Sequence, residues 1–256
     1  MQIGISHQRG PTDPGRGPVR VGWFLNKTEA PVIYDPPRRV NSRDARRDHA
    51  KSAARCPAVL NLETRYFEVP CPYDLNLGFA RDAAGKPMLR NLSGGQSSVR
   101  GSKLGQKIHV VREAEWRYPD RPTIQMGLPY VFIADEPVYL SQLDAYMHYS
   151  RTPRPGTIFG GRYPIDLWPR PLMWAFEWHD IDTPLVIRRG EPLFYCQFEA
   201  DGPDRAVQLV EAEKTPELET YLDHISGAVN YVSQTFSLFD AAARVRPDKL
   251  LKVREK

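Results

Sequence analysis

The sequence predicts a mainly β fold, and three observations support this prediction. Proline accounts for 24 of 256 residues, well above the roughly 5% that is average, and it fits poorly inside helices and central strands. Short segments of alternating polarity recur between turn residues from residue 59 to about residue 200. A helical period is sustained only after residue 215. With 41% hydrophobic residues, the chain can bury a sizeable core.

The elements follow one another in three parts. Residues 1–18 are rich in Gly, Pro and polar residues, so we expect a flexible N-terminal arm. The β domain extends over residues 19–200 and begins with two short strands around a turn at residues 26–29. Residues 201–256 form a C-terminal helical segment.

Positive charge is concentrated in residues 36–55, which hold seven Lys or Arg against two Asp, a net charge of +5. The whole chain carries +4, so its remainder is near −1. The low apolar content of this segment predicts a solvated surface, with a surface helix at about residues 42–54. A solvated face is favoured over phosphate binding here, and if the chain binds nucleic acid, this is the segment that would hold it. A structural or assembly protein would use it as a docking arm.

The middle of the chain gives further strand-like segments and one loop. The Gly- and Ser-rich residues 91–107 predict a mobile loop. They do not form a P-loop, because Gly101 is followed by Ser-Lys and the G-x-x-x-x-G-K-[ST] spacing is absent. A β-hairpin is predicted around a turn at residues 188–191.

The C-terminal segment changes to a helical period. Thr215 can cap a helix and Pro216 suits its first position. We expect one helix, or two divided near Gly227 or Ser233, packed on the sheet. The apolar positions that recur at three and four are Leu218, Leu222, Ile225, Val229, Val232 and Phe236.

Neither end nor middle of the sequence suggests export or membrane insertion. The N-terminus has no basic region followed by an apolar one, and no apolar run reaches about 18 residues. Cys56, Cys71 and Cys196 are odd in number and widely spaced, which is typical of reduced thiols. We therefore expect a soluble cytoplasmic protein.

The most structured stretch is "AFEWHDIDTPLVIRRGEPLFYCQFE", residues 175–199. If residues 172–179 form a strand, Trp174, Phe176 and Trp178 share one face, which must be core. Glu177 and His179 then share the other face, about 7 Å apart.

The pair formed by Glu177 and His179 has two interpretations. With a third ligand, His148 or His109, it would give a two-His, one-carboxylate Fe(II) site of an oxygenase. The order Glu-x-His is the reverse of the usual oxygenase pattern, and a sheet face needs polar residues in any case. A hydrogen-bonded or exposed structural pair is therefore favoured over a metal site or a catalytic pair.

Arginines near turns provide a second group of candidates, because arginine binds carboxylate or phosphate with two parallel hydrogen bonds. Arg162 stands beside Tyr163 and two glycines, where backbone and guanidinium can both approach an anion. We predict Arg151, Arg162 and Tyr163 as ligand-binding residues. The turn arginines are Arg151, Arg154, Arg162, Arg170, Arg188 and Arg189.

Three motifs, "CPYDLNLGF", "SRTPRPG" and "RRGEPLFYCQF", occur in this order within about residues 56–235. In these motifs the chain resembles a family of uncharacterised bacterial and phage proteins. That resemblance implies no activity.

A weaker similarity is to the β-clip fold of dUTPases and dCTP deaminases. Its counterparts here are Tyr73-Asp74-Leu75, Ser150-Arg151, residues 163–166 and residues 190–197. Pro72 stands where that motif has Gly, and Ser150-Arg151 departs from its Arg-Ser-Ser order. The resemblance implies a β-clip as an alternative to a jelly-roll or distorted barrel, and Mg-dependent nucleotide hydrolysis with Asp74 activating water.

Together these observations favour a protein that binds a small polar or anionic ligand, or a protein partner, in a cleft near Arg162, Glu177 and His179. The alternatives are a non-haem metal-dependent oxygenase, a nucleotide hydrolase and a structural or assembly protein that self-associates. No membrane partner is expected.

Overall fold

The fold was analysed in a computed structural model of the chain. The N-terminal arm, apart from its last two residues, and most of the predicted helix at residues 42–54 lie outside the described residues, as does Arg151. The structure describes residues 17–28, 32–41, 49, 52, 55–97, 99–148, 152–202, 205–228 and 235–255.

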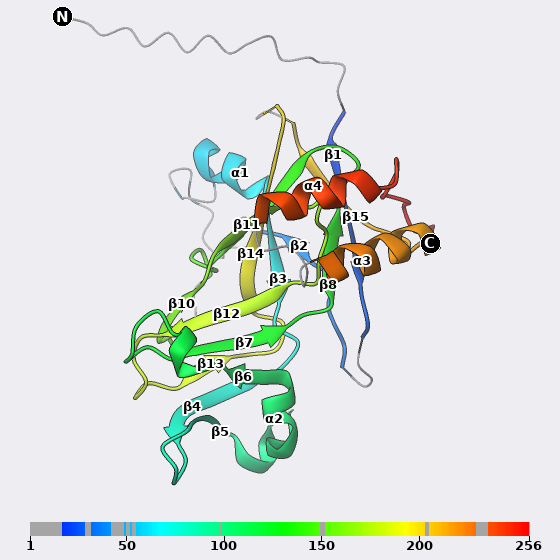
Figure 1. The fold of residues 1–256 in the computed structure, drawn as a ribbon. Helices are drawn as coiled ribbons and strands as arrows, with labels where there is room; N and C mark the ends of the chain where they lie inside the picture. Colours follow the sequence, from blue (N-terminus) through cyan, green and yellow to red (C-terminus); the bar gives the residue numbers. More distant parts are fainter. Residues whose placement is uncertain are drawn as a thin grey trace, which may run out of the picture.

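Two sheets face each other across the upper part of the main core (Figure 1). Their inner faces meet through aromatic rings, such as Phe132 and Phe198, whose centroids are 5.3 Å apart. The three-stranded sheet has the order β15 (Val207–Glu211), β1 (Val19–Leu25), β8 (Tyr130–Ile133). The five-stranded sheet has the order β11 (Gly161–Pro164), β9 (Val138–Leu143), β14 (Pro192–Ala200), β3 (Tyr66–Pro70), β2 (Arg38–Arg39).

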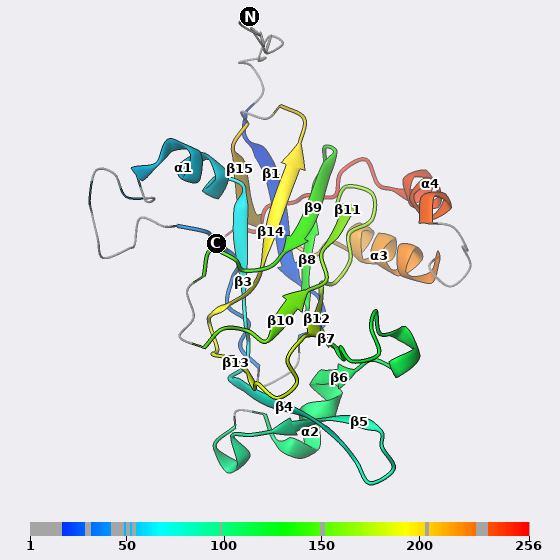
Figure 2. The same cartoon turned by 90° about the vertical axis from the view of Figure 1, so that its left-hand side faces the viewer.

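Two smaller sheets form the lower part of the molecule and share the same core (Figure 2). One has the order β10 (Gly156–Ile158), β12 (Met173–Trp178), β7 (Thr123–Gly127), β6 (Ile108–Val110). The other has the order β13 (Leu185–Ile187), β4 (Leu75–Arg81), β5 (Pro87–Asn91). Short helical segments connect the strands: α1 (Pro57–Glu63), η3 (Gly94–Gln96), α2 (Gly101–Lys107) and η4 (Glu113–Glu115).

A two-stranded ribbon links the upper and lower sheets. β3 pairs with β14 in the five-stranded sheet, and β4 pairs with β13 in the three-stranded one below. At the corner, the amide N–H groups of Cys71 and Gly190 donate to the carbonyl oxygens of Glu191 and Cys71, at 2.8 and 2.9 Å. Gly190 has φ +82°, a left-handed conformation that glycine adopts without steric cost. The turn at residues 188–191 forms as predicted, but β13 and β14 leave it toward different sheets, so the predicted hairpin is wrong.

The C-terminal segment forms two helices, α3 (Pro216–Ala228) and α4 (Thr235–Val245). They cover the outer face of the sheet β15-β1-β8 (Figure 1). Leu218, Tyr221 and Ile225 of α3 are buried there against Val131 and Ile133. The prediction of a mainly β fold with a packed C-terminal helical region is therefore confirmed. No sheet of the described strands closes into a barrel, and no described helix is long and apolar enough to span a bilayer.

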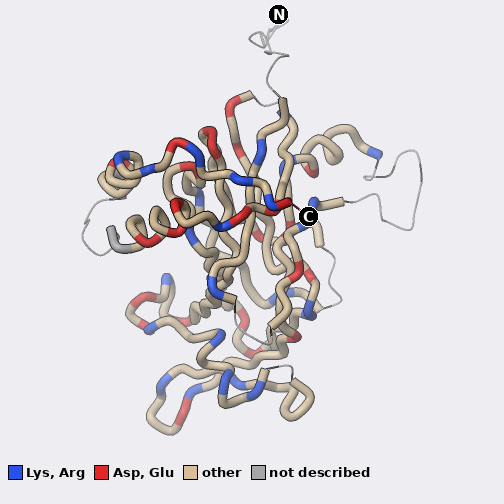
Figure 3. The backbone as a smooth tube through the Cα atoms, turned by 90° about the vertical axis from the view of Figure 1, so that its right-hand side faces the viewer, with Lys and Arg blue, Asp and Glu red and all other residues tan. Residues whose placement is uncertain are grey.

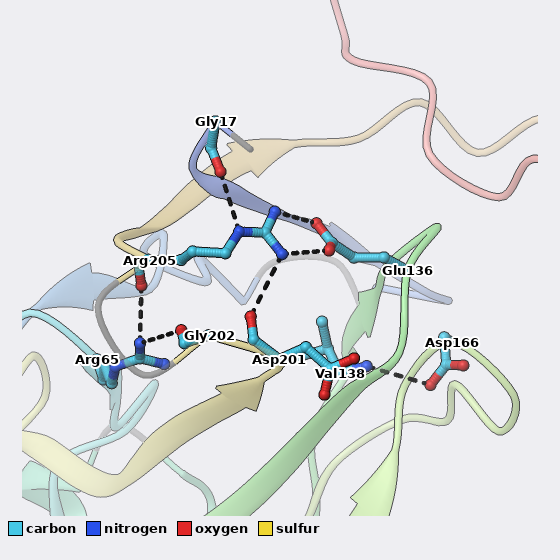
Figure 4. A network of polar contacts seen from close by, with 8 residues as sticks. All are labelled: Gly17, Arg65, Glu136, Val138, Asp166, Asp201, Gly202 and Arg205. Carbon is cyan, nitrogen blue, oxygen red and sulfur yellow. Dashed lines mark hydrogen bonds and ion pairs between the residues drawn. The ribbon is translucent and has the colours of Figure 1, made fainter. Parts of the chain in front are cut away.

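Arg205 connects several loops at the upper end of the sheets (Figure 4). Its guanidinium donates to both carboxylate oxygens of Glu136 in the turn between β8 and β9 and to the carbonyl oxygen of Gly17. Its own carbonyl oxygen accepts a 2.8 Å hydrogen bond from Arg65. Such bidentate pairs combine charge with fixed geometry, so Arg205 fixes the chain where it enters β15.

Four local predictions need correction. β15 pairs in parallel with β1, so the boundary at residue 200 does not separate strands from helices. Residues 59–63, expected to belong to the β pattern, lie instead in α1, which begins with Pro57, a residue that suits the first helical position. The predicted second strand before residue 35 is not formed by the described residues 32–37. The loop at residues 91–107 contains η3 and α2, with Leu104 buried in the core.

Candidate functional site

A cleft of about 600 Å³ opens between α3 and the segment Trp168–Met173. The turn after β1, the corner between β7 and β8, and Tyr34 complete its walls. The apolar part of the lining comes from Tyr34, Leu128, Trp168, Leu172, Leu222 and Ile225. Small-molecule sites typically have volumes of roughly 300–1,000 Å³ and mostly apolar walls with a few polar groups. The cleft matches this description.

The polar lining carries both signs of charge, with an excess of positive charge. Lys27 and Arg170 lie on the strand side, and Asp223 lies on α3. Arg170 stacks over the ring of Trp168, with 4.6 Å between the guanidinium carbon and the ring centroid. Within the described part of the chain, neither Lys27 nor Arg170 forms an ion pair. A ligand anion could therefore pair with either cation without displacing a described acidic side chain from an ion pair.

Prolines give the strand-side wall its shape. In the sequence Trp168-Pro169-Arg170-Pro171, each proline fixes its own φ near −65°. Each also restricts the preceding residue, Trp168 or Arg170, to extended conformations. The wall is therefore held in one backbone conformation before any ligand arrives, which reduces the entropy that binding would cost.

Trp168 is supported from behind by two other rings. Tyr163 and Phe239 both pack edge-to-face on it, at centroid distances of 5.9 and 5.8 Å. Tyr163 is itself 8% exposed, and burial raises the pKa of its hydroxyl above the usual range. The predicted ligand-binding residue Tyr163 thus positions a cleft residue and does not line the cleft.

The turn after β1 contributes two unusual groups to the cleft. Lys27 has φ +52°, a conformation that costs a non-glycine residue on the order of 1–3 kcal/mol. The Oδ1 atom of Asn26 is buried and has no hydrogen-bond partner among the described residues. Strained backbone and unpaired buried acceptors concentrate at functional sites, so both features favour this cleft as a binding site.

The opposite wall is anchored to the strand side by hydrogen bonds. The hydroxyl of Tyr221 on α3 donates to the carbonyl oxygen of Leu167 at 2.6 Å. Arg246, after α4, donates to the carbonyl oxygen of Asp166 at 2.7 Å. These contacts hold α3 beside Trp168 and maintain the opening of the cleft.

The predicted pair lies at the C-terminal end of β12, where Glu177 is on the strand and His179 directly follows its last residue. Trp174, Phe176 and Trp178 are at most 1% exposed, which confirms the predicted core face. On the other face, Nε2 of His179 lies 3.0 Å from Oε1 of Glu177. Met173, on the same face as Glu177, lines the cleft, and four residues of strand correspond to about 13 Å. The pair is therefore displaced from the cleft.

Glu177 is a buried carboxylate with mixed surroundings. It is 4% exposed, and Arg121 approaches Oε1 at 3.6 Å. Its Oε2 atom and the hydroxyl of Thr123, directly opposite in the ladder, are both buried without a hydrogen-bond partner among the described residues. Nε2 of His179 also lies 3.5 Å from the hydroxyl of Thr157. Because one imidazole nitrogen contacts both groups, the three residues do not form a catalytic triad, which uses both nitrogens.

The predicted metal site is not assembled by the described residues. Among them, no group of three His, Cys, Asp or Glu side chains is placed to hold a metal ion. His148 lies after β9, outside the sheet that carries Glu177 and His179, and its Nε2 atom is buried without a hydrogen-bond partner. His109 is exposed on β6. The preferred interpretation, a hydrogen-bonded Glu177–His179 pair, agrees with this geometry.

Arg162 and Asp74 are engaged in local contacts. Arg162 pairs with Glu199 at 2.9 Å and stacks over Tyr139 on the outer face of the five-stranded sheet. It therefore lies on a different sheet from Glu177. Asp74 is exposed at the corner of the ribbon, where its Oδ1 accepts the N–H of Arg189 at 2.9 Å.

Sequence reasoning found Arg170 only as one of six turn arginines and missed the rest of the cleft. The residues that line it come from four separate parts of the chain, residues 26–34, 127–129, 168–173 and 222–226. The alternation of Pro169 and Pro171 around Arg170 was the available signal, because it predicts a rigid extended segment.

The chain was compared with protein-family models, curated proteins and solved structures, and no significant match was found in any of them. The function therefore has to be argued from the site itself.

Proposed function

We propose that the chain binds a small organic anion with a flat apolar part in the cleft between α3 and the segment Trp168–Met173. One observation carries the proposal: an apolar cavity of about 600 Å³ contains two cationic side chains, Lys27 and Arg170, without ion-pair partners among the described residues. The flat part of the ligand packs beside Trp168, and its carboxylate, sulfonate or phosphate pairs with Arg170.

The rigidity of the cleft supports small-molecule binding over docking of a flexible peptide. The proline-flanked wall and the Tyr221–Leu167 hydrogen bond fix the two sides before binding. Asp223 and Ser226 on α3 offer polar groups opposite the cations, which suits a ligand with an anionic end and a second polar group.

A suitable probe is 8-anilinonaphthalene-1-sulfonate, an aromatic anion whose fluorescence rises in apolar sites. We expect saturable binding of one equivalent to the folded chain. The neutral N-phenyl-1-naphthylamine has the same rings without the sulfonate, and it should bind about tenfold more weakly, since a charge-assisted hydrogen bond contributes on the order of 1.5 kcal/mol.

Three variants locate the site. Arg170→Gln should weaken binding of the sulfonate about tenfold and leave the neutral probe unchanged, because only the charge is lost. Ser226→Phe should weaken both probes by occupying the cleft. Arg188→Gln removes an exposed arginine at the ribbon corner and should change neither. If Arg170→Gln and Ser226→Phe bind both probes like the unaltered chain, the cleft is not the site.

A further inference from the structure

A second charged surface lies at the foot of the molecule, in residues 81–121, which we call the basic lobe. It contains the turn after β4, then β5, η3, α2, β6 and η4 (Figure 1). The segment holds nine Lys or Arg against four Asp or Glu, a net charge of +5, while the whole chain carries +4. Figure 3 shows Lys and Arg segments gathered in this lower part.

The acidic residues of the basic lobe neutralise only part of its charge. Glu113 and Glu115 pair with Arg81 and Arg112. Asp82 accepts hydrogen bonds from backbone N–H groups within its own turn. Five exposed cations form no ion pair with any described residue, and these are Lys86, Arg90, Arg100, Lys103 and Arg117.

Three of these cations, Arg90, Arg100 and Lys103, stand on β5 or at the start of α2, and these elements pack against each other. α2 contacts both β5 and β6, and β5 contacts β6. Like charges held close together repel unless an anion binds between them, so this clustering favours a polyanionic partner.

An exposed aromatic ring accompanies the cations. Tyr118 is 44% exposed, and the guanidinium carbons of Arg117 and Arg121 lie 5.8 and 4.6 Å from its ring centroid. Proteins that bind single-stranded nucleic acid combine a cationic surface that follows the phosphates with aromatic rings on which bases stack.

We infer that the basic lobe binds single-stranded nucleic acid through its backbone phosphates, with Tyr118 as a stacking position. The large exposed apolar side chains in the described part of the basic lobe are Met88, Leu92 and Tyr118, with no Trp or Phe among them. An anionic membrane therefore fits the surface less well, because interfacial segments are anchored by several Trp, Phe or Leu side chains. Binding is independent of base sequence, since phosphate contacts carry no sequence information. The inference does not depend on the ligand proposed for the cleft.

The number of unpaired cations sets the expected salt dependence. Each phosphate neutralised on a single strand contributes a slope of about −0.7 in log K against log salt. Five contacts give a slope of about −3.5, so raising NaCl from about 50 to about 200 mM should weaken binding roughly a hundredfold.

The test is fluorescence anisotropy of a labelled oligothymidylate of about 20 nucleotides with the full chain at low salt. Arg100→Glu/Lys103→Glu should weaken binding at least about tenfold and flatten the salt slope. Arg244→Glu/Lys249→Glu makes the same charge change at exposed positions of the C-terminal region and should weaken it less than about threefold. Circular dichroism verifies folding, and Arg90→Glu/Arg117→Glu repeats the test on other elements.

Three results would overturn the inference. The first is absence of oligonucleotide binding at about 50 mM NaCl. The second is equal weakening by the lobe and control variants, which would indicate net charge alone. The third is binding that Arg46→Glu/Arg47→Glu abolishes while both lobe variants retain it, which would assign binding to residues 36–55. Sedimentation with phosphatidylserine-containing vesicles, without oligonucleotide binding, would point to a membrane instead.

Discussion

Gly156, the first residue of β10, is the position where one added methyl group should have the largest effect on the sheet next to Glu177. A Cβ atom there would lie 1.9 Å from the carbonyl oxygen of Glu177 and 2.9 Å from Cζ of Phe176. Real Cβ atoms essentially never approach within 3.0 Å of another atom. In Gly156→Ala, β10 must therefore move away from β12 by about 1 Å.

The expected cost follows from what that shift disturbs. Overpacking costs typically 1–3 kcal/mol, and the obstacle here is backbone, which cannot rotate away. The shift would also stretch the hydrogen bonds from the N–H groups of His179 and Asp180 to Pro155, now 2.7 and 3.1 Å. We therefore expect Gly156→Ala to lower the free energy of unfolding by about 3 kcal/mol, near the upper end of this range. At about 2–4 °C per kcal/mol for a chain of this size, the melting temperature should fall by about 6–12 °C.

Gly127→Ala is the matched control, because Gly127 lies in the same sheet, opposite Met173. A Cβ atom there meets nothing within 4 Å, and its φ is outside the left-handed region. Reduced entropy of the unfolded chain should stabilise this variant by about 0.4–1 kcal/mol. Calorimetry compares the melting temperatures, and hydrogen exchange follows the amides of His179 and Asp180. The reasoning fails if Gly156→Ala melts within about 2 °C of the unaltered chain, or if Gly156→Ala and Gly127→Ala lower the melting temperature by the same amount.

Three other measurements test the structure. Burial raises the pKa of Cys71 to about 12, so a thiol reagent at pH 8 should modify only the exposed Cys56 before unfolding; rapid reaction of a second thiol would contradict this. Burial also raises the pKa of Asp166. The protonated carboxyl therefore stabilises the fold below the unfolded pKa of about 3.9, and this stabilisation is lost as pH rises through the folded pKa. Asp166→Asn should raise the melting temperature, relative to the unaltered chain, more at pH 7 than at pH 4. Arg205→Lys loses the bidentate pair with Glu136 and should cost about 1–2 kcal/mol in chemical denaturation; an unchanged midpoint would show that this network adds no stability.

Local sequence patterns predicted those elements that are determined by residues close together in the chain. The alternation of rings in Trp174, Phe176 and Trp178 predicted β12, because a strand must place them on one buried face. Thr215 and Pro216 predicted the start of α3, and the hydroxyl of Thr215 accepts the N–H of Leu218 at 3.2 Å.

Long-range pairing could not be predicted from the same patterns. The turn at residues 188–191 looked like a hairpin, yet β13 pairs with β4, and β14 pairs with β3 and β9. The pairs β13–β4 and β14–β3 join residues more than 100 positions apart. The parallel pairing of β15 with β1 joins positions 188 residues apart, such as Val19 and Val207. A period of two assigns a face to each side chain but does not identify the partner strand.

The two candidate sites also differ in how much of each could be predicted from local sequence. The basic lobe is continuous in sequence, so its net charge can be counted from the sequence alone. It does not appear when residues 36–55 are compared with the rest of the chain as a whole, because acidic segments elsewhere cancel its charge. The cleft brings together Lys27, Arg170 and Asp223 only after the chain has folded. Its position therefore depends on the packing of α3, which no local pattern specifies.

The cleft and the basic lobe are joined by one row of hydrogen-bonded strands. Met173 and Gly127, at adjacent ends of β12 and β7, line the cleft, and β7 pairs with β6 at the edge of the lobe. Proximity alone does not establish coupling, and substitutions that share no partners usually act additively. Arg170→Gln should therefore leave oligonucleotide affinity unchanged, and Arg100→Glu/Lys103→Glu should leave sulfonate binding unchanged. A change in either cross-measurement would indicate that the sheet transmits a conformational difference between the two sites.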